Sequence, residues 1–315
     1  MKHAIVSTIV LAAVAWLAGW GFSPAGTAAQ AQARRSVAIT VDDLPQGGDG
    51  SPPAFDAVYA MNERLLRPFK DGRIPLTGFV NAHNELTLGA DNLRRILDLW
   101  LDAGAELGNH TYSHPDVDKV PLADYTADIA KGEPILRAAL GARGKTLRYF
   151  RHPYLHAGAT AETKARLQTF LDDAGYRVAP VTLDNSDYVY ATLYTRPEHR
   201  ERVRREYVPY MESVIEFFER RSVEVAGREF PQVLLIHANA LNADLMPELL
   251  DMFRRRGYDF VPLDTALADA AYRLPEAYVG PGGFSWIHRW SKTKGMPGKG
   301  EPDPPAWVMN AFAAR

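Results

Sequence analysis

Apolar and polar positions follow two periods along this chain, and these predict strands and helices in turn. The β-branched run at 36–41 is typical of a buried strand, whereas apolar residues at 93, 96, 97 and 100 keep the 3.6-residue period of a helix. The expected strands are 36–41, 74–80, 105–108, 147–150, 176–183, 232–236 and 258–262. The expected helices are 54–69, 91–103, 125–140, 160–174, 197–222, 243–256 and 264–272.

Strand and helix therefore alternate about seven times, which favours parallel strands covered by helices. A doubly wound open sheet and a closed or nearly closed barrel both satisfy this pattern. The choice rests on polar residues that follow the strands, because active sites of (β/α) barrels form at the carboxyl ends of the strands. These residues are Asp42, Asp43, His110, His114, Arg151, Asp184, Asp187 and His237. We predict an α/β fold, a (β/α) barrel of about seven parallel strands.

The first 33 residues have the pattern of an export signal. A positively charged start at Lys2 precedes an almost wholly apolar run at 4–20, and 29–31 and 31–33 both fit the small-x-small cleavage pattern. The alternative is an uncleaved anchor, because the apolar run is nearly long enough to span a membrane. We predict a cleaved signal peptide at 1–33 and a periplasmic or secreted protein, with membrane contact only through an uncleaved signal segment.

The remaining chain is predicted to form a main domain at 34–274 and a C-terminal strap at 275–315. The strap is rich in Gly and Pro and carries Trp286, Trp290 and Trp307. We expect these indoles to be buried against the barrel. The alternative is an aromatic platform for sugar rings, which indole faces also suit.

Composition narrows the chemistry. The 36 Lys and Arg residues balance 38 Asp and Glu residues, for a net charge of −2, so no basic stripe indicates a nucleic-acid partner. The chain has no cysteine, which excludes disulfides, a thiol nucleophile and a cysteine-ligated metal. Any metal must therefore be held by His, Asp or Glu.

Two polar pairs are candidates for such a site. His110 and His114 are four positions apart, so a helical turn would place both on one face, where they could bind one cation. Asp42 and Asp43 end an apolar strand, and buried carboxylates without a partner are costly. Two ordinary histidines and a plain polar turn are the alternatives.

Five stretches match, in order, the motifs of a known family. They are 40–43 (T-V-D-D), 110–114 (H-T-Y-S-H), 151–154 (R-H-P-Y), 184–188 (D-N-S-D-Y) and 235–237 (L-I-H). Over about residues 37–262 the chain resembles the polysaccharide deacetylases, the NodB-homology group or carbohydrate esterase family 4. The resemblance implies a distorted, NodB-like barrel and a catalytic domain at 34–274. Val41, Leu44, His152 and Tyr188 replace the family's usual Phe, Gly, Pro and Trp, which affects substrate preference more than chemistry.

The resemblance also implies a role for each motif residue. One divalent metal ion, most simply zinc but also cobalt, manganese or iron, would be bound by Asp43, His110 and His114. The catalytic residues would be Asp42 as base, Arg151 as its ion-pair partner, His237 as acid and Asp184 or a neighbour as the carboxylate that orients His237. The backbone N–H of Tyr154 would stabilise the oxyanion, and Tyr188 would line the substrate cleft.

These roles predict a metal-dependent hydrolase that removes acetyl groups, chiefly N-acetyl groups, from a glycan. Chitin oligomers, peptidoglycan and acetylated hemicellulose are all open as substrates. A metal-dependent amidohydrolase for a small molecule and a non-catalytic glycan-binding homologue are the alternatives. His83 and His156 receive no firm role, and the pair His152 and His156 is disfavoured as a metal site because Pro153 prevents a continuous helical turn.

Overall fold

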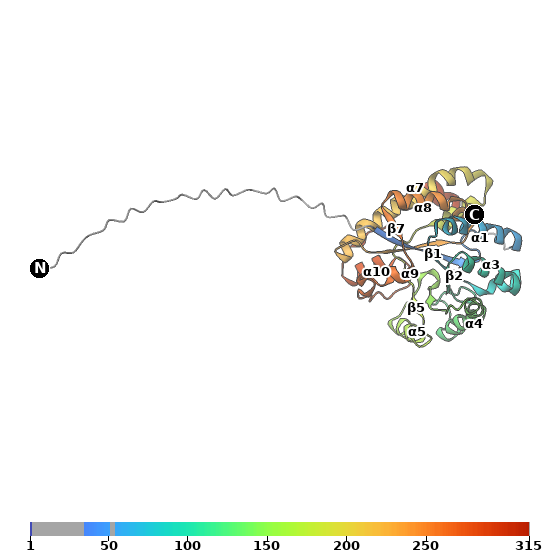
Figure 1. Ribbon diagram of the computed structural model, residues 1–315, viewed down its shortest axis with the longest axis horizontal. Coiled ribbons are helices and arrows are strands. Elements are labelled where there is room, and N and C mark those ends of the chain that lie inside the picture. The colour runs from blue at the N-terminus through green and yellow to red at the C-terminus, as the bar shows by residue number, and fades with distance from the viewer. Residues whose placement is uncertain (2–34, 51–53, 315) are drawn as a thin grey trace. The chain divides into compact units, whose positions relative to one another are not determined.

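The computed structural model describes residues 1, 35–50 and 54–314 (Figure 1). The predicted signal peptide, apart from Met1, lies outside the described residues. Among the helices of the described part, none is both long and apolar enough to cross a membrane.

A single parallel sheet of seven strands carries the fold (Figure 1). The strands are β1 (Arg35–Leu44), β2 (Leu76–Val80), β3 (Glu106–Asn109), β4 (Tyr149–Phe150), β5 (Arg177–Val178), β6 (Gln232–His237) and β7 (Tyr258–Phe260). Their order is β5-β4-β3-β2-β1-β6, and β7 pairs with the first residues of β1. Beyond β5, Leu183 forms a bridge to Leu234 of β6, so the two edges of the curled sheet approach each other. The predicted (β/α) barrel of parallel strands is confirmed, in distorted form.

Helices surround this sheet (Figure 1). They are α1 (Phe55–Gly72), α2 (Glu85–Leu88), α3 (Ala90–Asp102), α4 (Leu122–Gly141), α5 (Ala161–Asp173), α6 (Asp187–Tyr194), α7 (Pro197–Ala226), α8 (Ala240–Arg255), α9 (Leu263–Leu267), α10 (Trp286–Thr293) and α11 (Ala306–Ala313). The predicted helix at 264–272 is divided into α9 and a 3₁₀ turn, because the Asp269 side chain caps the new turn at the Ala271 N–H. Helix α6 was not predicted, because it follows a cluster of polar residues without a helical period.

β5 is much shorter than the predicted strand at 176–183. After Val178 the chain leaves β4 and meets the C-terminal segment, where the Trp286 N–H donates to the Val181 carbonyl at 2.7 Å. The backbone groups that would extend β5 therefore pair elsewhere.

The core forms where the strand pattern predicts it. Val37, Ile39 and Val41 of β1 are at most 2% exposed, and each such side chain contributes about 1.5–3 kcal/mol through its burial. The apolar face of α3 packs over the sheet, and the Trp100 indole N–H donates to Asn62 of α1 at 2.7 Å. The last residues of this central strand include the two adjacent carboxylates of the candidate site, Asp42 and Asp43.

The C-terminal segment is more regular than a strap. Trp286 and Trp290 are buried in α10, as expected, so they are not exposed sugar platforms. Trp307 of α11 is half-buried, and its indole N–H donates to Glu206 of α7 at 2.6 Å. Neither α10 nor α11 was predicted, because the segment contains many Gly and Pro residues.

Candidate metal and catalytic site

The predicted residues meet at the carboxyl ends of the strands. Asp42 and Asp43 lie at the end of β1, His110 follows β3, Arg151 follows β4, and His237 ends β6. A cavity of about 600 Å³ opens there. Eight of the nine predicted site residues line it: Asp42, Asp43, His110, His114, Tyr154, Asp184, Tyr188 and His237. Arg151, the ninth, is fully buried behind Asp42.

Asp43, His110 and His114 form a group that could hold a metal ion. Asp43 Oδ1 lies 3.4 Å from Nε2 of each histidine. Tetrahedral zinc with bonds of about 2.0–2.1 Å holds neighbouring donor atoms about 3.4 Å apart, so the spacing fits such an ion. Within the described residues, Asp43 Oδ1 is buried and has no hydrogen-bond donor, as expected of an atom that ligates a metal.

The histidines have the protonation that ligands need. Burial lowers the pKa of His110 well below its usual 6.5, and burial also lowers the pKa of His114. His110 Nδ1 lies 2.8 Å from the Arg151 carbonyl oxygen, which can only accept. Nδ1 therefore carries the proton, and the lone pair of Nε2 faces Asp43.

The segment that carries the two histidines is not helical, so they do not share a face through a helical turn. Thr111 and His114 have φ of 69° and 58°, in the left-handed region, so the chain turns sharply twice. Asp128 of α4 accepts hydrogen bonds from the Tyr112 and Ser113 N–H groups at 2.8 and 2.9 Å. This loop, rather than a helical face, brings the two rings to a centroid separation of 4.9 Å.

Another left-handed residue, Asp43, allows both aspartates to face the cavity. Neighbours in a regular strand point to opposite faces. The predicted strand ends at Val41, but β1 continues to Leu44, and its register against β2 shifts between Val41 and Leu44. Asp43 has φ of 60°, which breaks the alternation and lets the two carboxylates face one site.

Asp42 has a different environment from Asp43. Asp42 is 2% exposed, and its Oδ2 lies 3.4 Å from Nη1 of the fully buried Arg151, which also donates to Thr40 Oγ1 at 2.8 Å. Burial raises the pKa of Asp42 while Arg151 opposes the rise, and the pKa reaches about 6. A carboxylate with a pKa near neutrality suits proton transfer.

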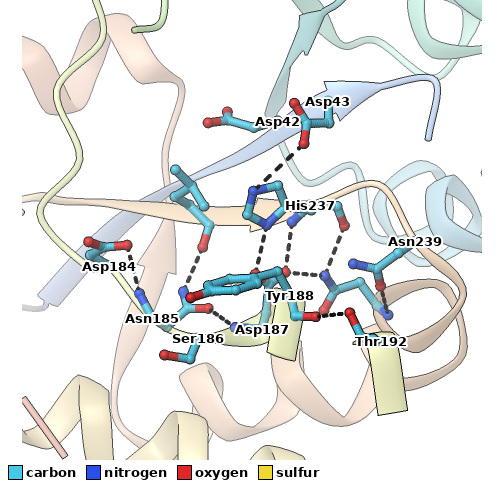
Figure 2. Close-up of polar contacts among 12 residues, drawn as sticks. Asp42, Asp43, Asp184, Asn185, Ser186, Asp187, Tyr188, Thr192, His237 and Asn239 are labelled. Atoms are coloured by element: carbon cyan, nitrogen blue, oxygen red, sulfur yellow. Dashed lines mark hydrogen bonds and ion pairs between the residues drawn. The ribbon is translucent and has the colours of Figure 1, made fainter. Parts of the chain in front are cut away.

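His237 is held by Asp187, not by Asp184. His237 Nδ1 lies 2.7 Å from Asp187 Oδ1, and the His237 backbone N–H donates to Asp187 Oδ2 at 2.8 Å. Figure 2 shows the His237 ring between Asp43 and Asp187, with Asp184 off to the side beside Asn185. Burial opposes protonation of His237, but Asp187 and the other nearby carboxylates raise its pKa to about 10. The assignment of Asp184 as orienting carboxylate is corrected, because α6 begins at Asp187 and presents that side chain to β6.

Two tyrosines lie at the cavity opening. Tyr154 is 55% exposed, and its ring lies 4.5 Å from the His114 ring. Tyr188 is 44% exposed, with ring centroids 6.4 Å from His237 and 5.9 Å from Phe312 of α11. Exposed aromatic faces at a polar cavity suit the apolar face of a sugar ring.

Two features of the site were not predicted from the sequence. Glu301 of the C-terminal segment lines the cavity and lies 2.8 Å from His288 Nε2. His156 Nδ1 lies 2.8 Å from Asp116 Oδ1 and 3.4 Å from Asp118 Oδ2, which ties the loop after β4 to the loop after β3. His152 is buried, and the group of possible metal ligands that includes His156 contains Asp116 and Asp118 instead.

Known proteins share this sequence pattern. A family model described as polysaccharide deacetylase matches residues 29–178. A chitin deacetylase of Colletotrichum lindemuthianum is 27% identical over 236 residues, which cover 74% of this chain and 80% of that enzyme. Over these residues the chain is similar to the polysaccharide deacetylase family.

Two further known proteins are less similar to this chain. One aligns over a smaller part of its own length, and the other shares only the fold. A peptidoglycan-N-acetylglucosamine deacetylase of Bacillus cereus is 29% identical over 121 residues, which cover 38% of this chain and 37% of that enzyme. The crystal structure of a mutant of a CE4 family pseudoenzyme from Bacillus anthracis has a TM-score of 0.50 at 16% identity and covers 75% of this chain and 68% of its own. That likeness supports the barrel fold alone.

Proposed function

We propose that this protein is a metal-dependent hydrolase that removes N-acetyl groups from a polysaccharide or oligosaccharide. The observation that carries the proposal is the group of three donor atoms on Asp43, His110 and His114, whose spacing suits one ion. The lowered pKa values of the two histidines favour the neutral form that binds a metal. Similarity to the family is not sufficient, because a CE4 family pseudoenzyme is known. In this chain both aspartates and all three histidines of the site are in place.

Zinc is the ion we propose for the three ligands, and cobalt, manganese or iron would suit the same donor set. When bound, such an ion polarises an acyl oxygen and lowers the pKa of a water molecule. Three protein ligands leave a coordination position open, as in catalytic rather than structural zinc sites.

The chain's own residues would move the protons. Asp42 would accept a proton from the attacking water, and the buried Arg151 would keep that carboxylate ionised before the reaction. The backbone N–H of Tyr154 would donate to the developing oxyanion. His237 would donate its Nε2 proton to the leaving nitrogen while Asp187 holds Nδ1. A C–O bond forms, the C–N bond breaks, and acetate and a free amine are released.

We infer the substrate class from the relatives and from the shape of the opening. The relatives are named for chitin and for the N-acetylglucosamine of peptidoglycan. Tyr154 and Tyr188 expose aromatic faces beside the cavity, where a glucosamine ring would pack. We therefore propose an N-acetylglucosamine glycan, ahead of the O-acetyl groups of hemicellulose.

Acetate release tests the proposal. Purified protein would be incubated with N-acetylglucosamine oligomers, peptidoglycan and acetylxylan, then again after chelation and after zinc or cobalt is added back. We expect release from an N-acetylglucosamine substrate that chelation abolishes and metal restores. Release from acetylxylan alone would overturn the N-acetyl assignment. No release from protein with metal bound would favour the small-molecule amidase or the glycan-binding homologue.

We also propose that the protein is exported, on the strength of the apolar run at 4–20 and the small residues before Arg34. N-terminal sequencing of the protein from the periplasm and medium of an expressing bacterium tests this. We expect a start at or near Arg34. Recovery of the intact chain from the cytosol would contradict export, and recovery of the intact chain from the membrane would support the anchor.

A further inference from the structure

The loop after β4 has a backbone that its own sequence does not favour. Tyr154 and Leu155 have φ of 55° and 56°, two consecutive non-glycine residues in the left-handed region. Such conformations persist only where the surroundings impose them. Both residues line the cavity, and Tyr154 packs against the metal-ligand candidate His114. Whatever imposes this backbone therefore also places the Tyr154 N–H.

The C-terminal segment supplies the contacts. The Arg289 guanidinium of α10 donates from Nη2 to the Leu155 carbonyl oxygen, and Arg289 is only 1% exposed. Gly283 packs on the preceding peptide so closely that a Cβ on it would lie 1.6 Å from the Tyr154 carbonyl oxygen. Arg289 thus binds the loop, and Gly283, which has no side chain, leaves room for it.

The same segment is anchored to the barrel on its other side. The Ser285 hydroxyl donates to the Thr182 carbonyl at 2.8 Å, and the Trp286 N–H donates to the Val181 carbonyl at 2.7 Å. The Arg289 guanidinium carbon lies 4.3 Å from the centroid of the Trp286 ring, which restricts its movement. Arg289 therefore contacts Leu155 from a segment that is itself anchored to the barrel.

The environment of Arg289 indicates a specific task. A buried guanidinium is costly unless its donors are used. Arg289 is 1% exposed, and the carboxylates of Glu276, Asp118 and Asp184 influence it through their charge. Its donors instead reach the Leu155 and Phe284 carbonyls, on two segments that meet at the cavity. A buried guanidinium with its donors used in this way restricts the position of the loop.

We propose that residues 283–289 form a positioning element of the active site, in which Arg289 and Gly283 hold Tyr154 and Leu155 in the left-handed conformation. This element lies beyond residue 178, where the match to the family model ends. The inference extends the proposed function, on which only its activity measurement rests. Arg289 acts here through the loop and does not touch the reacting atoms.

Arg289→Ala, Arg289→Lys and Gly283→Ala test the proposal. A matched control is Arg221→Ala, because Arg221 is also buried and donates to the Ser291 hydroxyl and the Pro297 carbonyl, away from the loop. For each variant we would measure kcat and KM for acetate release, metal content, Tm, and hydrogen exchange of a peptide spanning 152–158.

We expect Arg289→Ala to lower kcat about 100-fold, the loss typical of a misplaced group, with metal content retained and exchange in 152–158 accelerated. Arg289→Lys keeps one donor and should recover part of kcat. Arg221→Ala should lower Tm but leave kcat and exchange in 152–158 unchanged. If Arg289→Ala does not fold, Gly283→Ala, which keeps the guanidinium, should give the same pattern of slow turnover and fast exchange.

Two results would overturn the inference. One is normal exchange in 152–158 in both Arg289→Ala and Gly283→Ala. The other is an equal loss of kcat in Arg221→Ala, which would indicate general destabilisation. If the wild-type protein releases no acetate, the proposed function fails by itself, and the exchange measurement still decides whether residues 283–289 hold the loop.

Discussion

His237 and Asp187 are 50 residues apart in the chain, yet they meet in a two-point contact: Asp187 Oδ1 lies 2.7 Å from the ring Nδ1, and Oδ2 accepts the His237 backbone N–H at 2.8 Å. Asn242 adds a donor to Oδ2 at 2.7 Å. Burial opposes ionisation of Asp187, but His237 and these hydrogen bonds lower its pKa. The carboxylate is thus ionised and immobile, and it directs the His237 Nε2 proton toward the cavity.

Asp187→Asn should therefore weaken proton donation by His237. We expect kcat on N-acetyl substrates to fall about 100-fold or more, within the range of a lost general acid, while metal content is retained. Aryl acetate esters should lose much less, because their leaving group needs little protonation. The ratio of amide to ester turnover is the measurement.

Asp184→Asn is the matched control for that experiment. Asp184 accepts the Asn185 N–H at 2.9 Å, whereas the His237 ring nitrogen bonds Asp187. The amide-to-ester ratio should stay at its wild-type value. A lower ratio in Asp184→Asn, with a normal one in Asp187→Asn, would show that Asp184 orients the acid after all.

His114→Ala should remove the metal and turnover together. Its Nε2 is one of three donor atoms grouped for the ion, and two remaining ligands hold a divalent ion poorly. Elemental analysis and acetate release would be measured on the same preparation. His83→Ala is the control, because His83 lies beside the site and bonds the Tyr112 carbonyl without belonging to the donor group. Metal bound at wild-type stoichiometry in His114→Ala would refute the ligand assignment.

Sequence analysis located the rim of the site because the carboxyl ends of parallel strands meet at one edge of a sheet. Asp42, His110 and His237 could be placed together for that reason alone. It could not decide between Asp184 and Asp187, since the choice depends on where α6 begins, and α6 follows a cluster of polar residues without a helical period.

The backbone conformation of the site could not be predicted from the sequence either. The left-handed φ values at Asp43, Thr111 and His114 were not predicted from the sequence. The loop that carries the last two is held by local hydrogen bonds, from the Thr111 N–H to Asn109 and from the His114 N–H to Thr111, and by Asp128 of α4. The contribution of Arg289 was hidden because it is 134 residues from the carbonyl that it binds. Long-range contacts of this kind leave no periodic pattern.

Asp42→Asn should separate binding of the metal from turnover. The amide keeps the shape of the side chain beside Arg151 but cannot accept a proton from water. We expect kcat to fall about 100-fold or more with zinc content unchanged. Asp43→Asn should instead lose zinc, because the neighbouring carboxylate is the proposed ligand. Full turnover in Asp42→Asn would exclude Asp42 as the base.

Asp184 should make stability depend on pH. Burial, followed by the charge of Glu301, raises the pKa of Asp184 from the usual 3.8 to about 7. Between these values the folded state keeps a proton that the unfolded state releases, so this contribution to stability is present below about pH 4 and is lost as the pH rises through about 7. Asp184→Asn cannot ionise and should therefore raise Tm more at about pH 8 than at about pH 4, because the unfavourable charge of this partly buried side chain is removed only at the higher pH. Equal Tm changes at both pH values would show that Asp184 ionises as freely as in water.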